Sequence, residues 1–173
     1  MAHHGAADYV DQAVESLGGQ SFRDFELVVV DDVSDVDWRR VLPAARCATQ
    51  FVENGTNKGL TASLNIALSL SRGEYVARMD SDDVLVPERL QEQVEFLDAH
   101  PDVGIVGTAV EHIDASGRPL RRTYPITEPA DVSLCLGVFN QLAHGSVVMR
   151  ADVVRELGGY DLRYRYAQDY DLW

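Results

Sequence analysis

The chain has 173 residues, of which 46% are hydrophobic, and this is enough for one domain with a buried core. It has 28 acidic and 15 basic residues and a formal charge of −13, which argues against a nucleic-acid backbone as a partner. A phosphorylated metabolite remains compatible with this charge, provided that a cation or a helix N-terminus mediates the contact.

The sequence contains no run of 18 apolar residues and no signal peptide. Its two cysteines, Cys47 and Cys135, lie far apart, and neither has the neighbours of a metal-ligand motif. We therefore expect two buried thiols in a reducing compartment, and a cytosolic protein.

Up to about residue 100, the hydrophobic pattern alternates between strand and helix. The expected helices span 8–17, 38–45, 60–71 and a segment that opens at Pro87, and the expected strands span 25–30, 50–53 and 74–79. Nearly continuous apolar strands of this length suit a parallel sheet that is covered on both faces. The alternation predicts an α/β domain with a mostly parallel sheet.

Beyond residue 100 the pattern is mixed. We expect a long strand over 103–113, a hairpin turn at 114–117 and an antiparallel return over 120–124. A helix over 131–137, a strand over 146–150 and a short helix over 151–157 follow. No internal repeat and no low-complexity segment divides the chain.

The stretch from Gly73 to Pro87 carries the most chemical information. A short apolar strand runs directly into Asp80, Asp82 and Asp83, three carboxylates within four residues. Crowded carboxylates raise one another's pKa, and a divalent cation prefers such hard oxygen ligands. In an open α/β sheet, ligands bind outside the carboxyl ends of the strands, where this cluster falls. The alternative is a solvated acidic turn in which an aspartate caps the next helix.

Seven segments, taken in order, resemble the inverting family 2 glycosyltransferases, which have the GT-A fold. They are residues 21–32, 57–65, 73–83, 87–90, 144–150, 158–161 and 168–173. The likeness covers nearly all of the chain from residue 9 onward. It implies one Rossmann-like α/β domain over 1–173, with a mostly parallel sheet flanked by helices and a mixed, antiparallel C-terminal part. Residues 8–100 would form the nucleotide-binding part, and residues 101–173 an incomplete acceptor-side part.

The activity implied by this resemblance is metal-assisted sugar transfer, with inversion, from a nucleotide-diphosphate sugar to a hydroxyl acceptor. A glycan or lipid-linked acceptor, polysaccharide synthesis in a bacterium and peripheral association with the inner membrane face agree with the family. Two alternatives stay open. One is a non-catalytic module that keeps the fold, and the other is a nucleotidyltransferase, although that class usually opens with a Gly-rich loop that this chain lacks.

The resemblance also implies roles for the residues of the donor site. Asp31 and Asp32 would contact the nucleobase, because a carboxylate accepts hydrogen bonds from a base N–H. Lys58 would meet a phosphate as a point charge. Asp80 and Asp82 would bind the nucleotide sugar, with Asp82 facing the ribose. Asp82 and Asp83 would hold Mn²⁺ or Mg²⁺, which would offset the charge of the departing diphosphate.

Asp169 matches the family's catalytic base, which removes the proton of the acceptor hydroxyl as that hydroxyl attacks the sugar. Relatives usually have a glutamate before this aspartate, whereas this chain has Gln168. His144 and Asn140 lie in the part of the family near the acceptor, but a lone histidine is more often structural, so neither is assigned to catalysis. The alternatives for Asp31, Asp32, Lys58 and Asp169 are ordinary capping or surface roles.

The sequence departs from the family pattern at both ends. Family members begin with an apolar strand before the helix at 8–17. We find no such strand here, and we expect its loss to leave unpaired backbone groups on neighbouring strands. Trp173 directly follows the base motif, so the usual acceptor-site helices are expected to be missing. A chain of this kind would bind its donor poorly and turn over little.

Overall fold

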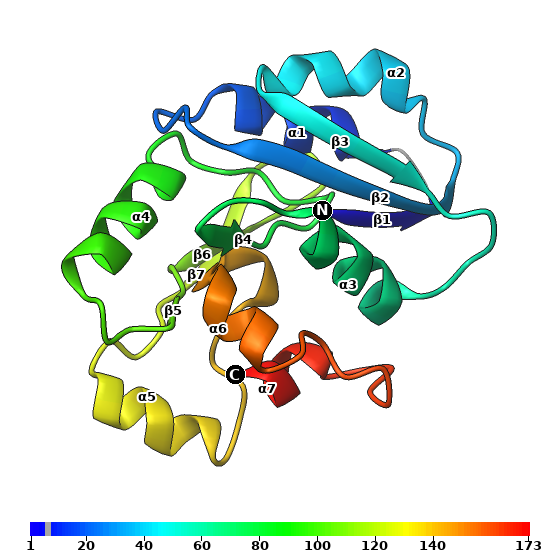
Figure 1. The fold of residues 1–173 in the computed structure, drawn as a ribbon. Helices are drawn as coiled ribbons and strands as arrows, with labels where there is room; N and C mark the ends of the chain where they lie inside the picture. The colour runs from blue at the N-terminus through cyan, green and yellow to red at the C-terminus, as the bar shows by residue number, and fades with distance from the viewer. Residues whose placement is uncertain (6–7) are drawn as a thin grey trace.

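A computed structural model describes residues 1–5 and 8–173 (Figure 1). The strands are β1 (Ala2–Gly5), β2 (Glu26–Ser34), β3 (Ala48–Glu53), β4 (Tyr75–Ala77), β5 (Ile105–Val106), β6 (Val110–Ile113), β7 (Pro119–Thr123) and β8 (Val148–Arg150). The helices are α1 (Val10–Gly18), α2 (Trp38–Val41), α3 (Leu60–Leu70), α4 (Arg89–Ala99), α5 (Pro129–Leu136), α6 (Ala151–Glu156) and α7 (Gln168–Leu172). Among the described residues, no helix has the length and apolar character needed to cross a bilayer.

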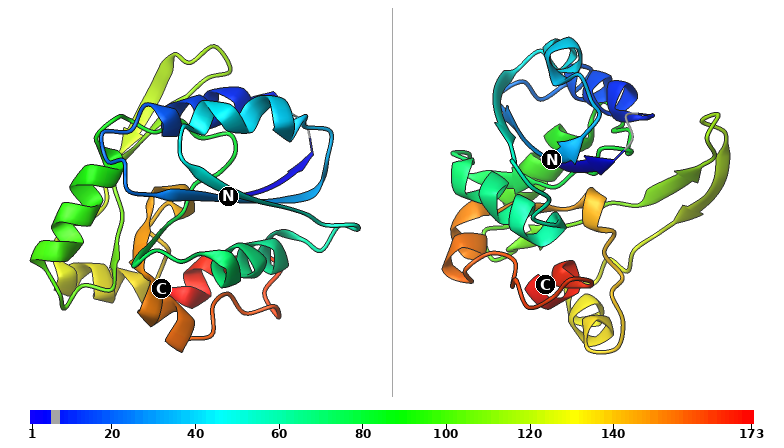
Figure 2. Two further views of the ribbon diagram at one scale, coloured as in Figure 1. Left: turned by 45° about the horizontal axis from the view of Figure 1, so that its top comes forward. Right: turned by 90° about the vertical axis from the view of Figure 1, so that its right-hand side faces the viewer.

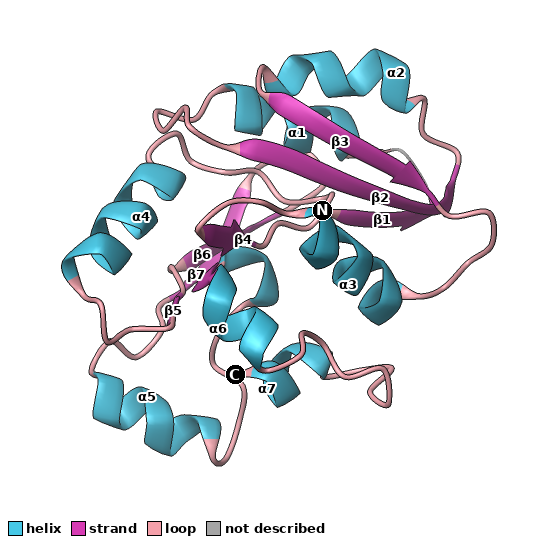
Figure 3. Ribbon diagram, in the orientation of Figure 1, coloured by secondary structure: helices cyan, strands magenta, loops and turns pink. Residues whose placement is uncertain are grey.

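The strands form three separate sheets, as the secondary-structure colouring shows (Figure 3). β1, β2 and β3 are parallel and lie in that order. β8 pairs in antiparallel fashion with β4 on one side and β5 on the other, and β6 and β7 form a hairpin. The predicted α/β class, with a parallel N-terminal part and an antiparallel C-terminal part, is confirmed.

The prediction that the first strand is absent is wrong. β1 pairs in parallel with β2, with Ala2 opposite Val30 and His3 opposite Asp31. The ladder begins one residue earlier, because the Val30 N–H donates to the Met1 carbonyl at 3.0 Å. Ala-His-His-Gly has little β propensity, so no local pattern predicts a strand here. The strand forms because ladder hydrogen bonds need only backbone groups, and the side chains of Ala2 and His3 are buried.

The two faces of the parallel sheet are covered by different helices (Figure 2, left). α1 and α2 lie on one face, where Val10, Val14 and Leu17 pack with Leu27 and Val29 of β2 in the main core. α3 lies on the other face. The helical face expected for residues 8–17 is therefore the buried one, except that Tyr9 is exposed. This covering explains why β2 is apolar on both sides.

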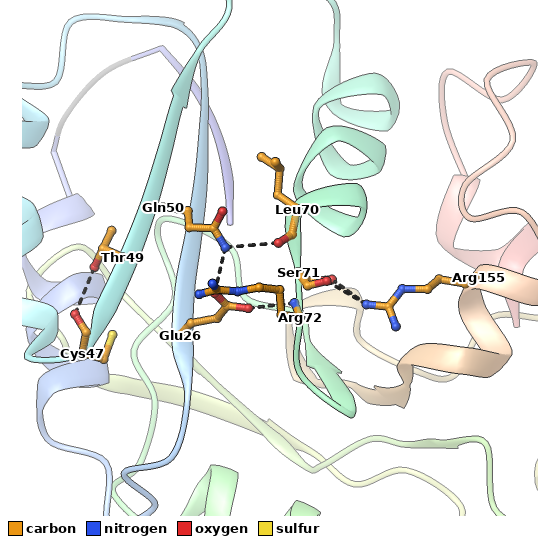
Figure 4. A network of polar contacts seen from close by, with 8 residues as sticks. All are labelled: Glu26, Cys47, Thr49, Gln50, Leu70, Ser71, Arg72 and Arg155. Carbon is orange, nitrogen blue, oxygen red and sulfur yellow. Dashed lines mark hydrogen bonds and ion pairs between the residues drawn. The ribbon is translucent and has the colours of Figure 1, made fainter.

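A polar network links the start of β2 to the end of α3 (Figure 4). The carboxylate of Glu26 pairs with Arg72 at 2.8 Å and accepts a hydrogen bond from Gln50 of β3. Gln50 also donates to the Leu70 carbonyl, and Arg155 of α6 donates to the Ser71 carbonyl. The hydrogen bond from Arg72 lowers the pKa of Glu26 and outweighs the cost of its partial burial. The network fixes the C-terminal end of α3 against both β2 and α6.

The long strand expected over 103–113 is two strands. Ile105 of β5 pairs with Met149 of β8, whereas Val110 of β6 pairs with Thr123 of β7. Residues 107–109, between β5 and β6, belong to no strand. The hairpin projects from the body of the molecule (Figure 2, right). The predicted helices near the C-terminus are α5 and α6, and α7 was not predicted.

Candidate active site

The C-terminal part of β2 and the turn after β4 carry the first two groups of predicted acids, and His3 of β1 contacts both regions. Its Nδ1 shares a hydrogen bond with Ser81 Oγ at 2.7 Å. Burial lowers the pKa of His3, while the charges of Asp31 and Asp82 act on the same ring in the opposite direction. The structure therefore brings the acids in the C-terminal part of β2 and the acids after β4 into one neighbourhood.

Asp32 is a structural acceptor for the turn before α3. Its Oδ1 accepts hydrogen bonds from the Asn54 side chain at 2.7 Å and from the Lys58 N–H at 2.8 Å, and its Oδ2 accepts one from the Gly59 N–H at 2.8 Å. Burial opposes the ionisation of Asp32, but these three bonds outweigh it and lower its pKa. The carboxylate thus shapes the 54–59 turn, a role that sequence reasoning did not foresee.

Asp31 is equally buried but is left with an open acceptor. Its Oδ2 has one long contact with the Ser34 N–H at 3.4 Å. Its Oδ1 has no hydrogen-bond partner within the part of the chain that the structure describes. A buried carboxylate oxygen without a partner is costly, so such an atom at the end of a strand points to a ligand donor.

The Asp80–Asp83 turn gathers like charges. The pKa of Asp83 is raised, first by partial burial and then by repulsion from Asp80 and Asp82, although Arg89 and Arg78 act against this. Asp80 pairs with the buried guanidinium of Arg78, which also donates to the Met79 carbonyl. Asp82 and Asp83 nevertheless remain accessible to solvent. The acids of this turn therefore repel one another beside the buried guanidinium of Arg78.

Gly145 closes one side of this turn. A Cβ atom at this position would overlap Asp83 Oδ2 and would lie 3.1 Å from Asp80 Oδ2. The chain between α5 and β8 therefore approaches both carboxylates more closely than any side chain would permit. This contact joins the C-terminal half of the chain to the acidic turn.

Asp169 lies in the first turn of α7. Its Oδ2 accepts a hydrogen bond from Asn140 Nδ2 at 2.8 Å, and Asn140 Oδ1 in turn accepts one from the Trp173 indole at 3.2 Å. Asn140, which the sequence left without a role, thus orients the predicted base. The residue before this helix, Ala167, has a left-handed φ of 58°. Such a backbone is uncommon for alanine and is often found near functional sites.

His144 connects Asp169 with the acidic turn. Its Nε2 lies 3.0 Å from the hydroxyl of Tyr160, and its ring packs edge-on against both Tyr160 and Trp173. Burial and then the charge of Arg78 lower the pKa of His144 to about 4, and the charges of Asp80 and Asp169 act in the opposite direction. The predicted base and the acidic turn therefore share one neighbour. Only the backbone of Lys58 is held in place, because its N–H donates to Asp32 Oδ1, whereas the residue is exposed.

The acidic turn has the donor atoms that a hard divalent cation prefers. In residues 1–5 and 8–173, no three histidine, cysteine, aspartate or glutamate side chains converge into a ready-made metal site. Magnesium is commonly bound by only one or two carboxylates together with substrate phosphates, so this turn fits that mode. The repulsion that raises the pKa of Asp83 is what a cation would relieve.

The chain belongs to glycosyl transferase family 2, because residues 1–158 match the model of that family. The putative glycosyltransferase EpsE of Bacillus subtilis is 37% identical over 169 residues, which cover 94% of this chain and 59% of EpsE. The amylovoran biosynthesis glycosyltransferase AmsE of Erwinia amylovora is 33% identical over 172 residues, which cover 95% of this chain and 62% of AmsE. The chain therefore spans about three fifths of the length of these relatives.

Two solved structures show the same GT-A fold. TarS of S. aureus, in complex with UDP-GlcNAc, superimposes with a TM-score of 0.78 at 21% identity over 99% of this chain and 50% of that chain. The mannosyltransferase PcManGT of Pyrobaculum calidifontis, in complex with GDP-Man and Mn²⁺, gives a TM-score of 0.64 at 23% identity over 92% of this chain and 46% of that chain.

Proposed function

We propose that this chain carries the donor-binding and base-bearing part of an enzyme that transfers a sugar, with inversion, from a nucleotide-diphosphate sugar to a hydroxyl acceptor. Membership of the family supports this class of reaction. One structural observation carries the proposal. His3 lies opposite Asp31 in the β1–β2 ladder and hydrogen-bonds Ser81 of the acidic turn, and the backbone at Gly145, next to His144, abuts the carboxylates of Asp83 and Asp80.

Asp31 is the acid that would read the nucleobase. Its free Oδ1 can accept a hydrogen bond from the N3–H of uracil or the N1–H of guanine. TarS was solved with a uridine nucleotide and PcManGT with a guanosine nucleotide, and both bases offer such a donor. Asp32 would contribute indirectly, because it fixes the turn from which the exposed Lys58 side chain can reach a phosphate.

Asp82 and Asp83 would hold Mn²⁺ or Mg²⁺, with Asp80 beside them, and the diphosphate would complete the coordination. When bound, the cation would neutralise charge on the nucleoside diphosphate. The chain itself prepares this position. Arg78 holds Asp80, and Gly145 leaves room for the carboxylate of Asp83. Asp82 would also face the ribose.

Asp169 would act as the general base. The hydrogen bond from Asn140 fixes its carboxylate, which would remove the proton of the acceptor hydroxyl while the hydroxyl oxygen attacks C1 of the sugar. The C1–O bond to the phosphate breaks as the new bond forms on the opposite face, which inverts the anomeric centre. We assign residues 8–100 to donor binding and residues 101–173 to the acceptor side. A glycan or lipid-linked hydroxyl would be the acceptor, and peripheral contact with a membrane would suit it.

Thermal-shift titration with UDP, GDP and TDP, each with and without Mn²⁺, tests donor binding. We expect one nucleotide to stabilise the protein in a metal-dependent manner. Asp31→Asn should weaken the binding of this nucleotide at least about tenfold, because the amide NH₂ presents a donor where the base N–H needs an acceptor. Asp102→Asn, in an exposed turn after α4, is the matched control. If no nucleotide stabilises the protein, the proposal fails and a non-catalytic module becomes the better interpretation.

Release of free sugar or transfer to a model acceptor tests the role of Asp169. Loss of a general base typically lowers the rate 10²- to 10⁴-fold, so Asp169→Asn should reduce kcat by about that factor and leave nucleotide affinity unchanged. Asp171→Asn, two residues along and exposed, is the control. Equal rates in the wild type and in Asp169→Asn would rule out this base. The same assay tests the expectation that the 173-residue chain turns over slowly.

A further inference from the structure

The loop that leads into α7 carries alternating apolar and basic side chains, all of them exposed. In chain order they are Leu162, Arg163, Tyr164, Arg165 and Tyr166. Large apolar side chains that gather on a surface often mark a binding site, whereas scattered ones need no explanation. The next turn of the chain carries Asp169, the proposed base. These side chains therefore lie beside the place where an acceptor must bind.

The backbone of this loop is held by hydrogen bonds on both sides of Tyr164. The Arg163 N–H donates to Asp161 Oδ1 at 2.8 Å, and the Tyr164 N–H donates to the Asp161 carbonyl at 3.1 Å. The Tyr164 carbonyl accepts a hydrogen bond from Thr61 Oγ1 at 3.0 Å, which fixes the loop beside the N-terminal end of α3 (Figure 1). The exposed side chains are thus presented by an anchored loop.

The two arginines of the loop differ in their partners. Arg163 forms an ion pair with Asp161 at 2.5 Å. Arg165 forms no ion pair with any residue of 1–5 or 8–173, and its guanidinium lies over the ring of Tyr166, 5.8 Å from the centroid. An aromatic ring restrains a guanidinium without neutralising it. A chain with 28 acidic and 15 basic residues therefore keeps a positive charge available here.

Arg165 and Tyr166 together offer two kinds of contact. A guanidinium binds carboxylates and phosphates through two parallel hydrogen bonds. The Tyr166 side chain is 78% exposed, so the guanidinium leaves most of its ring open. Sugar rings have apolar C–H faces that pack on such rings, while the phenol hydroxyl can bond to sugar hydroxyls. The pair suits a sugar unit that carries a negative charge.

The position of the pair relative to the base supports the same ligand. Asn140 holds Oδ2 of Asp169, so Oδ1 is the oxygen that would take the proton of an acceptor hydroxyl. Tyr166 precedes Asp169 by three residues, so their Cα atoms lie within about 11 Å of each other. A short oligosaccharide that presents a hydroxyl to Asp169 can therefore reach Tyr166 and Arg165 with another part of the same molecule.

We propose that Arg165 and Tyr166 form an acceptor subsite for a sugar unit with an anionic group. Arg165 binds the anionic group, and Tyr166 packs against the sugar ring. The group is either a carboxylate of an acidic glycan or a phosphate that links a glycan to a lipid. The inference rests on the proposed function for the role of Asp169, but binding at this subsite needs neither the donor nor a metal.

Titration with three sugar probes, without nucleotide or metal, tests the proposal. Hexagalacturonate carries carboxylates, maltohexaose is a neutral oligomer of the same length, and glucose linked through a diphosphate to citronellol carries phosphates. We expect one anionic probe to bind at least about tenfold more tightly than maltohexaose, and salt should reduce this difference. The probe that binds more tightly identifies the anionic group. The NMR signal of the Arg165 Nε–H should shift on binding and reports the contact locally.

Variants of the same loop separate the two contacts. Arg165→Gln should lose the preference for the anionic probe and bind maltohexaose as the wild type does, whereas Arg163→Gln is the matched control and should keep the preference. Tyr166→Ala should weaken all three probes, and Tyr166→Phe should restore most of that loss. These side chains are exposed, so every variant should melt close to the wild type.

Three results would overturn the proposal. They are a wild type that binds no probe or binds all three alike, an Arg165→Gln variant that keeps the preference, and equal losses in Arg165→Gln and Arg163→Gln. Because these titrations contain no nucleotide, their failure would leave metal-dependent stabilisation by a nucleotide untouched. Conversely, a protein that binds the anionic probe but no nucleotide would keep the subsite and contradict the proposed function.

Discussion

The two acidic strand ends of this molecule look alike in sequence but differ in what surrounds their carboxylates. Near the C-terminal end of β2, Asp32 accepts three hydrogen bonds from the protein itself, and its pKa is lowered. After β4, the neighbours of Asp83 include Asp80 and Asp82, and its pKa is raised. The first acid is satisfied within the fold, and the second is not.

This difference separates carboxylates that stabilise the fold through protein hydrogen bonds from carboxylates whose repulsion a bound cation would relieve. A carboxylate that receives backbone N–H bonds stabilises the folded state, because those donors would otherwise be buried unpaired. A carboxylate that faces other carboxylates destabilises it until a cation binds. Asp31 belongs to a third kind, since it is buried and keeps one open oxygen. Substitutions at the two ends should therefore change stability in opposite directions.

The largest change in stability is expected for Asp32→Ala. It would leave the N–H groups of Lys58 and Gly59 and the amide of Asn54 without their acceptor, and we expect the free energy of unfolding to fall by about 3 kcal/mol. Urea denaturation measures this change. Asp35→Ala, an exposed acid in the loop after β2, is the control and should stay within about 0.5 kcal/mol of the wild type. Equal decreases in the free energy of unfolding in both variants would contradict the structural role of Asp32.

Asp83→Asn should stabilise the protein when no metal is present. Without metal it removes repulsion, and it should raise the free energy of unfolding by less than about 1 kcal/mol, because solvent screens this exposed side chain. With Mn²⁺ present, the metal-dependent part of nucleotide binding should disappear. Calorimetric titration of nucleotide with and without Mn²⁺ measures both states of the same variant. Metal-dependent binding as strong as that of the wild type would contradict the assignment of Asp83.

The sequence predicted where the acids lie but not which of them is already satisfied. The apolar runs predict that both acidic groups follow a strand. This holds for Asp80 after β4, whereas β2 continues through Asp31 and Asp32 to Ser34 because Asp31 pairs with both β1 and β3. The donors to Asp32 come from a turn more than twenty residues away, so their geometry exists only after β3 has formed beside β2. Distant partners of this kind cannot be read from a local pattern.

The same limit explains the missed elements. β1 has the sequence of a loop, and only its pairing with β2 makes it a strand. The roles of His3 and Gly145 also depend on contacts with residues about sixty or more positions away, Ser81 and Asp83. A glycine at 145 is visible in the sequence, but the carboxylate that requires it is not. The sequence shows which residue types are present, but which side chains contact one another follows only from the folded structure.

Gly145→Ala should perturb the acidic turn after β4 without changing any acidic residue. The new methyl group would displace the carboxylate of Asp83, which lies at the end of a flexible side chain, so the protein should still fold. We expect metal-dependent nucleotide binding to weaken by about tenfold, while metal-independent binding through Asp31 stays the same. Gly104→Ala, just before β5, where a Cβ would meet only Val153 Cγ1 at an ordinary 3.8 Å, is the matched control. If the two variants bind alike, Gly145 does not shape the acidic turn.

The smallest effect should appear in the pH dependence of stability, measured in the presence of a metal chelator. The folded-state pKa of Asp83 lies above its ordinary value of 3.8, so between these two values the folded protein binds more protons than the unfolded chain. Stability due to Asp83 therefore decreases as the pH rises through this window. The folded-state pKa of Asp32 lies below 3.8, so its contribution is present above pH 3.8 and decreases as the pH falls below it.

Melting curves of the wild type, Asp83→Asn and Asp32→Asn between pH 3 and 6 separate the two contributions. Asp83→Asn should gain most over the wild type near the upper end of this range, whereas the deficit of Asp32→Asn should shrink toward the lower end. The amino group of Met1 also titrates, with its pKa lowered from 8.0 to about 5, but all three proteins share it, so it cancels in the differences. If both differences changed with pH in the same direction, the two strand ends would not be electrostatic opposites. The repulsion at Asp83 would then no longer support a cation site at the acidic turn.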